Sequence, residues 1–182
     1  MPVSSLKGHL LVAGPALVDP NFRRSVVLVG DHGDEGALGV ILNRASDSTV
    51  DEAVPELAAL VDGAAPVHVG GPVQPSAIVV LAEFAEPDRA EALVLEDIGF
   101  LPSEIDPDVL GELRRTRVFA GYAGWGPGQL DDELREGSWI VEPAEPADVF
   151  TADPDELWSD VLRRKGGPFG VLALMPPDPS LN

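Results

Sequence analysis

The sequence predicts an α+β fold in which a strand-rich mixed sheet packs against a few helices. Short apolar runs rich in Val, Leu and Ile recur along the chain, and each is bounded by turn residues, as is typical of strands. The 19 glycines and 18 prolines are distributed between these runs throughout the chain. Helical patterns are fewer and alternate irregularly with the strands, so a regular βαβ repeat is not expected.

Nine apolar runs are predicted to be strands of this sheet. The second and third runs are joined by the turn sequence Asp-His-Gly-Asp-Glu-Gly and are expected to form a hairpin-like pair. In chain order the predicted strands are residues 9–13, 25–30, 37–43, 66–69, 77–82, 92–96, 117–123, 138–141 and 169–174.

The clearest helical pattern begins at Asp153. The sequence Asp-Pro-Asp-Glu supplies an N-cap, a proline at the first helical position and a glutamate three residues after the cap. An apolar stripe follows, and Gly166 is expected to end the helix. The stripe consists of Leu157, Trp158, Val161 and Leu162.

A second helix is predicted over residues 127–136, with Leu130 and Leu134 facing inward. Residues 49–61 and 103–113 also have helical patterns, but a proline interrupts each of them.

The length and the even distribution of turn residues predict a single domain over residues 1–174. We find no internal repeat and no linker in this range. Residues 175–182, Met-Pro-Pro-Asp-Pro-Ser-Leu-Asn, are expected to form a flexible C-terminal tail.

The charge of the chain restricts its partners. The 182 residues include 31 acidic and 12 basic side chains, which gives a net charge of −19. Binding to a polyanion requires clustered Lys and Arg residues, so direct binding to nucleic acid or to anionic lipid is not expected. The 45% hydrophobic content is sufficient for a globular fold.

The composition also argues against several kinds of site and against membrane insertion. The chain contains no cysteine, which excludes disulfides, thiolate zinc sites and cysteine nucleophiles. The three histidines are too far apart in sequence to indicate a metal cluster, and no cofactor motif is present. No apolar run approaches the ~20 residues that span a bilayer, and the N-terminus lacks a signal-peptide core, so we expect a cytoplasmic protein.

Three segments carry candidate ligand-binding residues. Asn43 follows a predicted strand and precedes Arg44, so an amide and a guanidinium are available to a polar or anionic ligand. The alternative is that Asn43 braces a turn through its own side chain. Gly70 and Gly71 follow another strand, where they allow either close approach to a ligand or a tight turn.

The third segment is the glycine-rich block over residues 121–129, Gly-Tyr-Ala-Gly-Trp-Gly-Pro-Gly-Gln. It matches neither known phosphate-binding glycine motif, so a phosphate site is not predicted. Tyr122 and Trp125 offer flat faces suited to the wall of a cleft or to core packing. We predict that one cleft is lined by six residues: Asn43, Gly70, Gly71, Tyr122, Trp125 and Gln129.

No catalytic residue is assigned from the sequence. His32 lies in an acidic turn, where it is expected to be solvated, although a role as a general base is the alternative. Ser25 adjoins two arginines but lacks the surroundings of a nucleophile elbow.

Four segments of the chain resemble the YqgE/AlgH family, also called UPF0301 or DUF179. They are LKGHLLVAGPALVDPNFRRSVVLVGDHGDEGALGVILNR, VHVGGPVQP, VFAGYAGWGPGQLDDELREGSWIV and LWSDVLRR, which occur in that order between Leu6 and about Lys165. The resemblance implies an α+β fold around a flattened, partly barrel-like sheet, and together with the strand pattern it implies a central GYAGWG strand. The chain departs from the usual family residues at Gly14, Ala82 and Asp131.

The resemblance implies no specific activity, and the label of transcriptional regulator carried by one branch comes without a recognised DNA-binding motif. The sequence therefore favours a binding or regulatory module that recognises a protein or a small polar ligand through the predicted cleft. The alternative is an enzyme of unknown reaction, a hydrolase or a transferase, that uses His32, Asn43 or the helix start at Pro127. The oligomeric state is not predicted.

The net charge leads to a first prediction. The isolated protein should show no measurable binding to duplex DNA at ~150 mM salt, because non-specific affinity depends on counterions released by basic side chains. Fluorescence anisotropy with a labelled duplex measures this directly. A sequence-dependent rise in anisotropy at submicromolar protein would contradict the prediction and would require a basic face.

Overall fold

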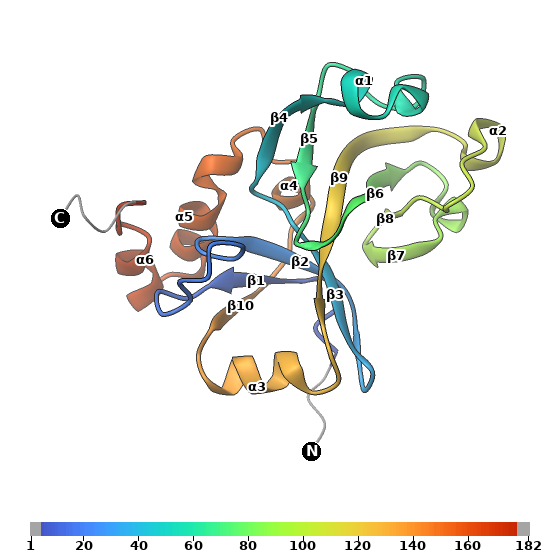
Figure 1. The fold of residues 1–182 in the computed structure, drawn as a ribbon. Coiled ribbons are helices and arrows are strands. Elements are labelled where there is room, and N and C mark those ends of the chain that lie inside the picture. The colour runs from blue at the N-terminus through green and yellow to red at the C-terminus, as the bar shows by residue number, and fades with distance from the viewer. Residues whose placement is uncertain (1–4, 178–182) are drawn as a thin grey trace.

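The longest strand, β9 (Leu113–Trp125), joins the two halves of the sheet (Figure 1). The computed structural model describes residues 5–177. The C-terminal part of β9 pairs antiparallel with β3 (Gly36–Ile41), and its middle pairs parallel with β5 (Pro66–Val69). The other edge of β9 pairs antiparallel with β6 (Val73–Phe84). The prediction that the GYAGWG strand is central is confirmed.

The described residues form one open sheet of ten strands, in the order β10-β1-β2-β3-β9-β6-β8-β7, with β4 and β5 off this path. All pairs are antiparallel except β5 with β9. The predicted strand-rich α+β fold is therefore confirmed, and the sheet does not close into a barrel. The strands not yet given are β1 (His9–Ala13), β2 (Val26–Gly33), β4 (Ala45–Thr49), β7 (Ala92–Leu95), β8 (Ile98–Phe100) and β10 (Trp139–Pro143).

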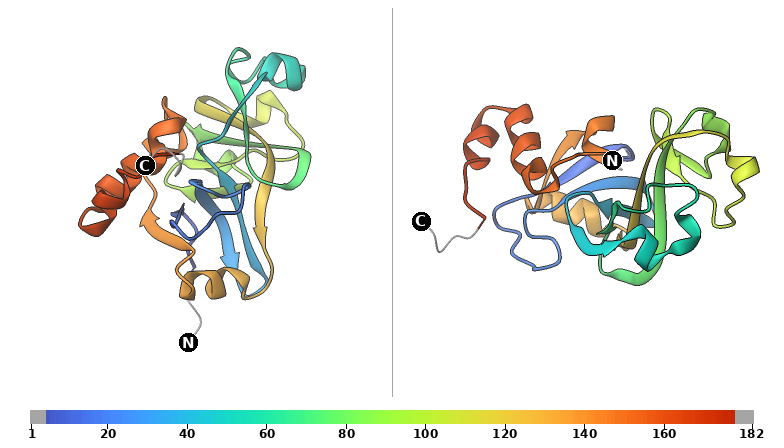
Figure 2. Two further views of the ribbon diagram at one scale, coloured as in Figure 1. Left: turned by 60° about the vertical axis from the view of Figure 1, so that its left-hand side comes forward. Right: turned by 90° about the horizontal axis from the view of Figure 1, so that it is seen from above.

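The two C-terminal helices cover one face of the sheet beside β10 and β1 (Figure 2). The predicted apolar stripe of α5 (Pro154–Lys165) is buried there, and the helix ends at Gly166 as expected. The helix α6 (Pro168–Leu172) packs against α5. The other helices are α1 (Val50–Ala53), α2 (Pro107–Leu110), α3 (Gln129–Arg135) and α4 (Pro146–Val149), with short 3-10 turns at Pro55–Leu57 and Pro87–Arg89.

The strands β1 and β2 are buried on both faces. Leu10 and Leu28 belong to the core beneath α5, whereas Leu11 and Val27 belong to a second core beside α3. Successive side chains of a strand point to opposite faces. A strand covered on both faces reads as a continuous apolar run, which is why these strands were visible in the sequence.

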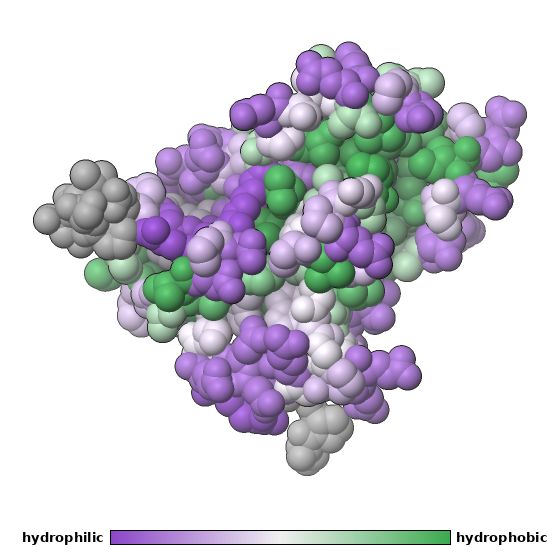
Figure 3. Space-filling view, viewed as in Figure 1, coloured by the Kyte–Doolittle hydropathy of each residue, from purple (hydrophilic) through white to green (hydrophobic). Residues whose placement is uncertain are grey.

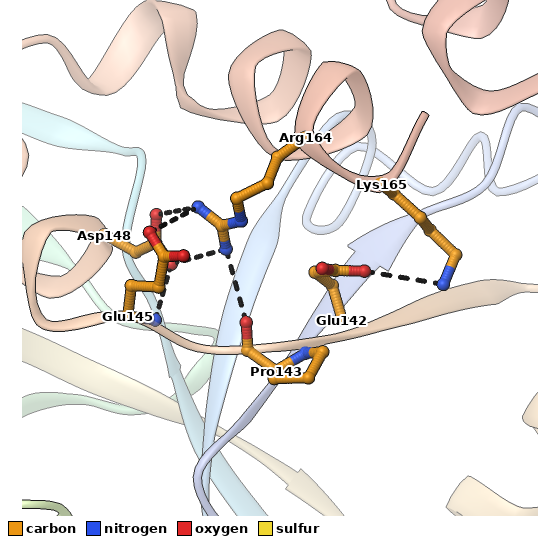
Figure 4. Close-up of polar contacts among 6 residues, drawn as sticks. All are labelled: Glu142, Pro143, Glu145, Asp148, Arg164 and Lys165. Carbon is orange, nitrogen blue, oxygen red and sulfur yellow. Dashed lines mark hydrogen bonds and ion pairs between the residues drawn. The ribbon is translucent and has the colours of Figure 1, made fainter. Parts of the chain in front are cut away.

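Charged side chains attach α5 to the segment around β10 (Figure 4). Arg164 donates two hydrogen bonds to the carboxylate of Asp148, at 2.9 and 2.8 Å, and a third to the carbonyl of Pro143. Lys165 donates to the carbonyl of Val141. Asp148 is buried, so the bidentate pair supplies the countercharge of a carboxylate that otherwise accepts only from the amide of Glu145, at 2.8 Å.

Several predicted elements differ in the structure. Residues 169–174, predicted to be a strand, form α6 and the turn after it, because Gly167 and Pro168 begin a helix that packs on α5. Helical structure is limited to α1 and the 3-10 turn at Pro55–Leu57 in residues 49–61, and to α2 in residues 103–113. Of the predicted flexible tail, residues 178–182 lie outside the described residues.

The glycines at residues 70, 71 and 121 mark a point where two backbones cross. The chain leaves β5 on one edge of β9 after Val69, which pairs with Ala120, and enters β6 on the other edge at Val73, which pairs with Tyr122. Three residues therefore carry the chain over β9 at Gly121. A Cβ atom at Gly121 would lie 2.4 Å from the carbonyl oxygen of Gly71, which is too close for any side chain.

This crossing predicts that Gly121→Ala is strongly destabilising. The φ of +75° alone costs roughly 1–2 kcal/mol for a residue with a Cβ atom, and the contact with Gly71 adds to that cost. Gly137→Ala is the matched control, because Gly137 has a φ of +77° and open space around its Cβ position. The urea concentration at the midpoint of unfolding should fall clearly further for Gly121→Ala than for Gly137→Ala. Equal losses for the two variants would show that the crossing tolerates a side chain.

Candidate functional site

A pocket of about 510 Å³ lies where the two halves of the sheet meet. Its walls come from β2 and β3 on one side and from β6, β7 and β8 on the other. Tyr122 of β9 is half-buried in this wall, and Lys7 and Asp31 are the charged lining residues. The volume and the predominantly apolar lining are those of a site for a small organic molecule.

A second pocket, of about 520 Å³, overlaps the first in its lining residues. The two pockets share Val79 and Phe100, and we call them together the apolar groove. The second pocket is also lined by Ile78 and Ile105, which are large apolar side chains left exposed. Figure 3 shows hydrophobic residues gathered on this part of the surface, between α1 and α2. The apolar groove is therefore a surface with unburied hydrophobic area.

Asn43 braces the backbone at the start of β2. Its side-chain oxygen accepts a hydrogen bond from the amide of Val26 at 2.9 Å, and its side-chain nitrogen donates to the carbonyl of Arg24 at 2.8 Å. The amide is thus occupied by the protein itself. Asn43 also lines a separate pocket of about 600 Å³ that contains Arg23, Arg24 and Arg44.

The guanidinium groups in this pocket donate hydrogen bonds to backbone carbonyl oxygens, which are neutral acceptors. Arg44 donates to the carbonyls of Asn21 and Arg23, and Arg24 donates to the carbonyl of Met175. The guanidinium of Arg24 also stacks 4.1 Å from the ring of Trp158. Burial lowers the pKa of Arg24 and of Arg44 from the usual arginine range.

The end of the glycine-rich block packs on α3. The side chain of Trp125 lies in the core with only 7% of the residue exposed, and its indole nitrogen donates to Glu133 at 3.2 Å. Gln129 is exposed; its oxygen accepts from the amide of Gly126 at 3.0 Å, and its nitrogen donates to Glu133 at 3.0 Å. Both side chains hold the start of α3 against the sheet.

The structure does not bring the six predicted residues to one pocket. Tyr122 lines the apolar groove, and Asn43 lines the arginine-containing pocket. Gly70 and Gly71 lie at the backbone crossing, where each is buried against β9. Trp125 and Gln129 line neither of these pockets.

His32 is buried, with 9% exposed, rather than solvated as the sequence suggested. Its Nδ1 accepts a hydrogen bond from the amide of Leu6 at 3.1 Å, so the proton of a neutral ring must be on Nε2. Nε2 lies 3.2 Å from the carboxylate of Asp131 and donates to it. Both ring nitrogens are therefore engaged, and His32 has no free lone pair to act as a general base. Sequence reasoning missed this contact because the two residues are far apart in the chain.

A second buried histidine was also missed by sequence reasoning. His68 of β5 is 1% exposed and, with Arg117, lines a small cavity of about 40 Å³. Burial and the positive charge of Arg117 lower the pKa of His68 to about 4. Its position between two valines in a predicted strand was the available signal of burial.

The part of the chain that the structure describes contains neither a metal-binding cluster nor a membrane-spanning helix. No three His, Asp or Glu side chains of residues 5–177 are grouped so that they could hold a metal ion. None of the helices in this range has the length and the apolar character needed to cross a membrane.

Sequence comparisons agree with one another. A family model described as AlgH-like, DUF179, matches residues 10–170. A UPF0301 protein of Streptomyces coelicolor is 46% identical over 99% of this chain and 97% of its own length. A UPF0301 protein of Thermobifida fusca is 46% identical over 98% of this chain and 96% of its own length.

Solved structures show the same fold. The crystal structure of a Corynebacterium diphtheriae protein has a TM-score of 0.83 and 32% sequence identity, and covers 93% of this chain and 92% of that chain. The solution structure of the AlgH protein from Pseudomonas aeruginosa has a TM-score of 0.72 and 29% identity, and covers 97% of each chain.

The burial of Trp125 leads to a stability prediction. Trp125→Ala should lower the free energy of unfolding by roughly 3–5 kcal/mol, as expected for a large aromatic side chain removed from a core. Gln129→Ala, at an exposed position in the same segment, should cost far less. Denaturant midpoints measure both. A cost for Trp125→Ala no larger than that for Gln129→Ala would place Trp125 at a surface rather than in the core.

Proposed function

The chain belongs to the AlgH-like family, and from this premise we propose that it is a binding module whose ligand occupies the apolar groove. The ligand we propose is a small molecule with an apolar body and a polar or anionic end. The observation that carries this proposal is the pair of pockets that share Val79 and Phe100, each with a largely apolar lining and a few polar groups.

The two ends of the apolar groove differ in chemistry. The first pocket carries Tyr122, whose ring offers a flat apolar face with a hydroxyl at its tip, and Lys7, whose ammonium suits an anionic group. Asp31 beside them allows a hydrogen-bond donor on the ligand. The second pocket is lined mainly by aliphatic side chains, with Glu56 and Glu91 as its charged residues. A ligand with one polar end would therefore bind in one direction.

This proposal changes the ligand that the sequence suggested. The predicted cleft joined Asn43, the two glycines and the glycine-rich block around a small polar ligand. Asn43 already makes two hydrogen bonds within the protein, and the glycines serve the crossing of two backbones. Of the predicted residues, Tyr122 supports binding at the apolar groove, and the apolar lining favours an amphipathic ligand over a polar one. We do not propose the enzyme alternative that uses His32 or Asn43, since both ring nitrogens of His32 and the side-chain amide of Asn43 are engaged within the protein.

The test uses anilinonaphthalene sulfonate, a fluorescent probe with an aromatic body and an anionic sulfonate. Ala92 is exposed and lines the first pocket, so Ala92→Trp should fill this pocket with little effect on stability. We expect saturable probe fluorescence with the parent protein and at least roughly tenfold weaker binding to Ala92→Trp, equivalent to about 1.4 kcal/mol. Lys7→Gln should weaken binding by less, because it removes only the charge.

The matched control is Ala45→Trp. Ala45 is an exposed strand residue of β4 that lines neither pocket of the apolar groove. The Ala45→Trp variant should bind the probe as the parent protein does. Urea midpoints of all variants show whether the probe reports a folded site or partial unfolding. Equal binding by Ala92→Trp and Ala45→Trp in folded proteins would exclude the first pocket as the site.

A further inference from the structure

Buried polar atoms without hydrogen-bond partners gather at one place in the fold. Among the described residues, four buried side-chain nitrogen or oxygen atoms lack a partner. Three of the four belong to His68 and Arg117: both ring nitrogens of His68 and Nη1 of Arg117. The fourth is the hydroxyl of Ser25. Orphaned buried groups are rare in native proteins, so three on neighbouring side chains call for a physical cause such as a bound ion or water.

The backbone explains why these two side chains meet. His68 of β5 is in parallel register with Phe119 of β9, and Arg117 precedes Phe119 by two residues on the same strand. Residues two apart on a strand point to the same face, so Arg117 and Phe119 share the face of the sheet that His68 occupies. The ring of His68 packs 5.8 Å from the ring of Phe119, which is consistent with this placement.

Both residues line a small cavity. It measures about 40 Å³ and is lined by His68, by Thr116, Arg117 and Val118 of β9, by Val50 of α1 and by residues 61, 62, 65 and 66. A buried water needs about 10–15 Å³ of such a cavity, so the cavity accommodates one small ion or a few waters but no organic ligand. It shares no lining residue with the apolar groove, and it is therefore a separate site.

We propose that this cavity is a binding site for a small inorganic anion held by Arg117 and His68. Arg117 carries a permanent positive charge, and its buried Nη1 has no acceptor within the protein. Burying an unpaired charge is costly, and a neutral water compensates it less well than an anion does. His68 adds an N–H donor in its neutral form and two donors when protonated. The site therefore offers donors and positive charge.

One carboxylate opposes the anion. Asp62 lines the cavity but is exposed, and its oxygen accepts a hydrogen bond from the amide of Ala64 at 3.0 Å, which holds the loop. Arg117 and Asp62 are the charged groups that line the cavity beside His68. In the present arrangement Nη1 is covered by protein atoms, so the guanidinium must turn towards the cavity to contact an anion. Asp62 would compete with the anion for the turned guanidinium.

Anion binding and protonation of His68 should favour each other. Without an anion, burial and the charge of Arg117 keep the pKa of His68 well below its usual value of 6.5. A bound negative charge offsets that of Arg117 and raises the pKa of His68 in the complex. Because the pKa is higher in the bound state, anion affinity must increase as the pH falls. A site filled by water, or an internal pair of Asp62 with Arg117, predicts no such dependence on added anion.

The test is a titration of the full chain with sodium sulfate, followed through the ring resonances of His68 by NMR. Sulfate keeps the same charge throughout the relevant pH range. Sodium gluconate, whose anion is too large for the cavity, holds the ionic strength constant. We expect a saturable shift of the His68 resonances in the millimolar range, with tighter binding at pH 5 than at pH 7, because the pKa of His68 is about 4 before the anion raises it. The resonances of His9 and His32 serve as internal references.

Three variants separate the proposal from its alternatives. Arg117→Gln should weaken sulfate binding at least roughly tenfold, whereas Arg114→Gln, which removes one charge from an exposed position on β9, should bind as the parent does. Asp62→Asn should strengthen binding several-fold because it removes the competing carboxylate. This exposed change also keeps the test valid if Arg117→Gln fails to fold. The absence of a saturable shift in the parent, or equal affinities in the parent and Asp62→Asn, would overturn the proposal.

Discussion

The crossing of two backbones at Gly71 and Gly121 is the constraint on which the arrangement of the sheet depends. Because the chain passes over β9 at this point, β5 and β6 can occupy opposite edges of the same strand. The amide of Gly70 donates to Ala120 of β9, and its carbonyl accepts from Ile41 of β3, so the crossing segment also separates β3 from the middle of β9. The apolar groove lies where the β3 and β6 halves of the sheet then diverge.

The same constraint accounts for the glycines that first suggested a ligand site. A glycine next to a strand end allows close approach of another backbone, and in this fold the approaching backbone belongs to the protein itself. The groups that a ligand could contact are therefore the side chains beside the glycines and not the glycines themselves. Tyr122 follows Gly121 and faces the apolar groove, whereas Arg117 and His68 lie before the crossing and border the small cavity.

The predictability of each element from sequence follows from its surroundings. The strands β1 and β2 were predicted because burial on both faces gives a continuous apolar run. The polar strand β4 and the short strand β8 were not predicted. Neither has an apolar run typical of a strand, and each is a strand because its backbone pairs with a neighbouring strand. Residues 169–174 were mistaken for a strand, since a short apolar run has no periodicity that separates a strand from a buried helical turn. The predicted site required knowing which distant segments meet in space. The spacing of residues along the sequence reveals neither the contact of His32 with Asp131 nor the proximity of His68 to Arg117.

Because the chain is strongly acidic, an arginine without a carboxylate partner is unexpected. With 31 acidic residues available, a partly buried cation that lacks a carboxylate does so because of geometry and not scarcity. Arg164 and Arg115 have carboxylate partners in Asp148 and Glu83, whereas Nη1 of Arg117 has no acceptor. A duplex DNA would encounter the net charge of the whole surface, because its phosphates extend well beyond the screening length of about 8 Å at physiological salt. An ion inside a cavity of about 40 Å³ would instead be dominated by the guanidinium beside it. Exclusion of a polyanion and binding of a small anion are thus compatible in one molecule, since the two depend on charge at different distances.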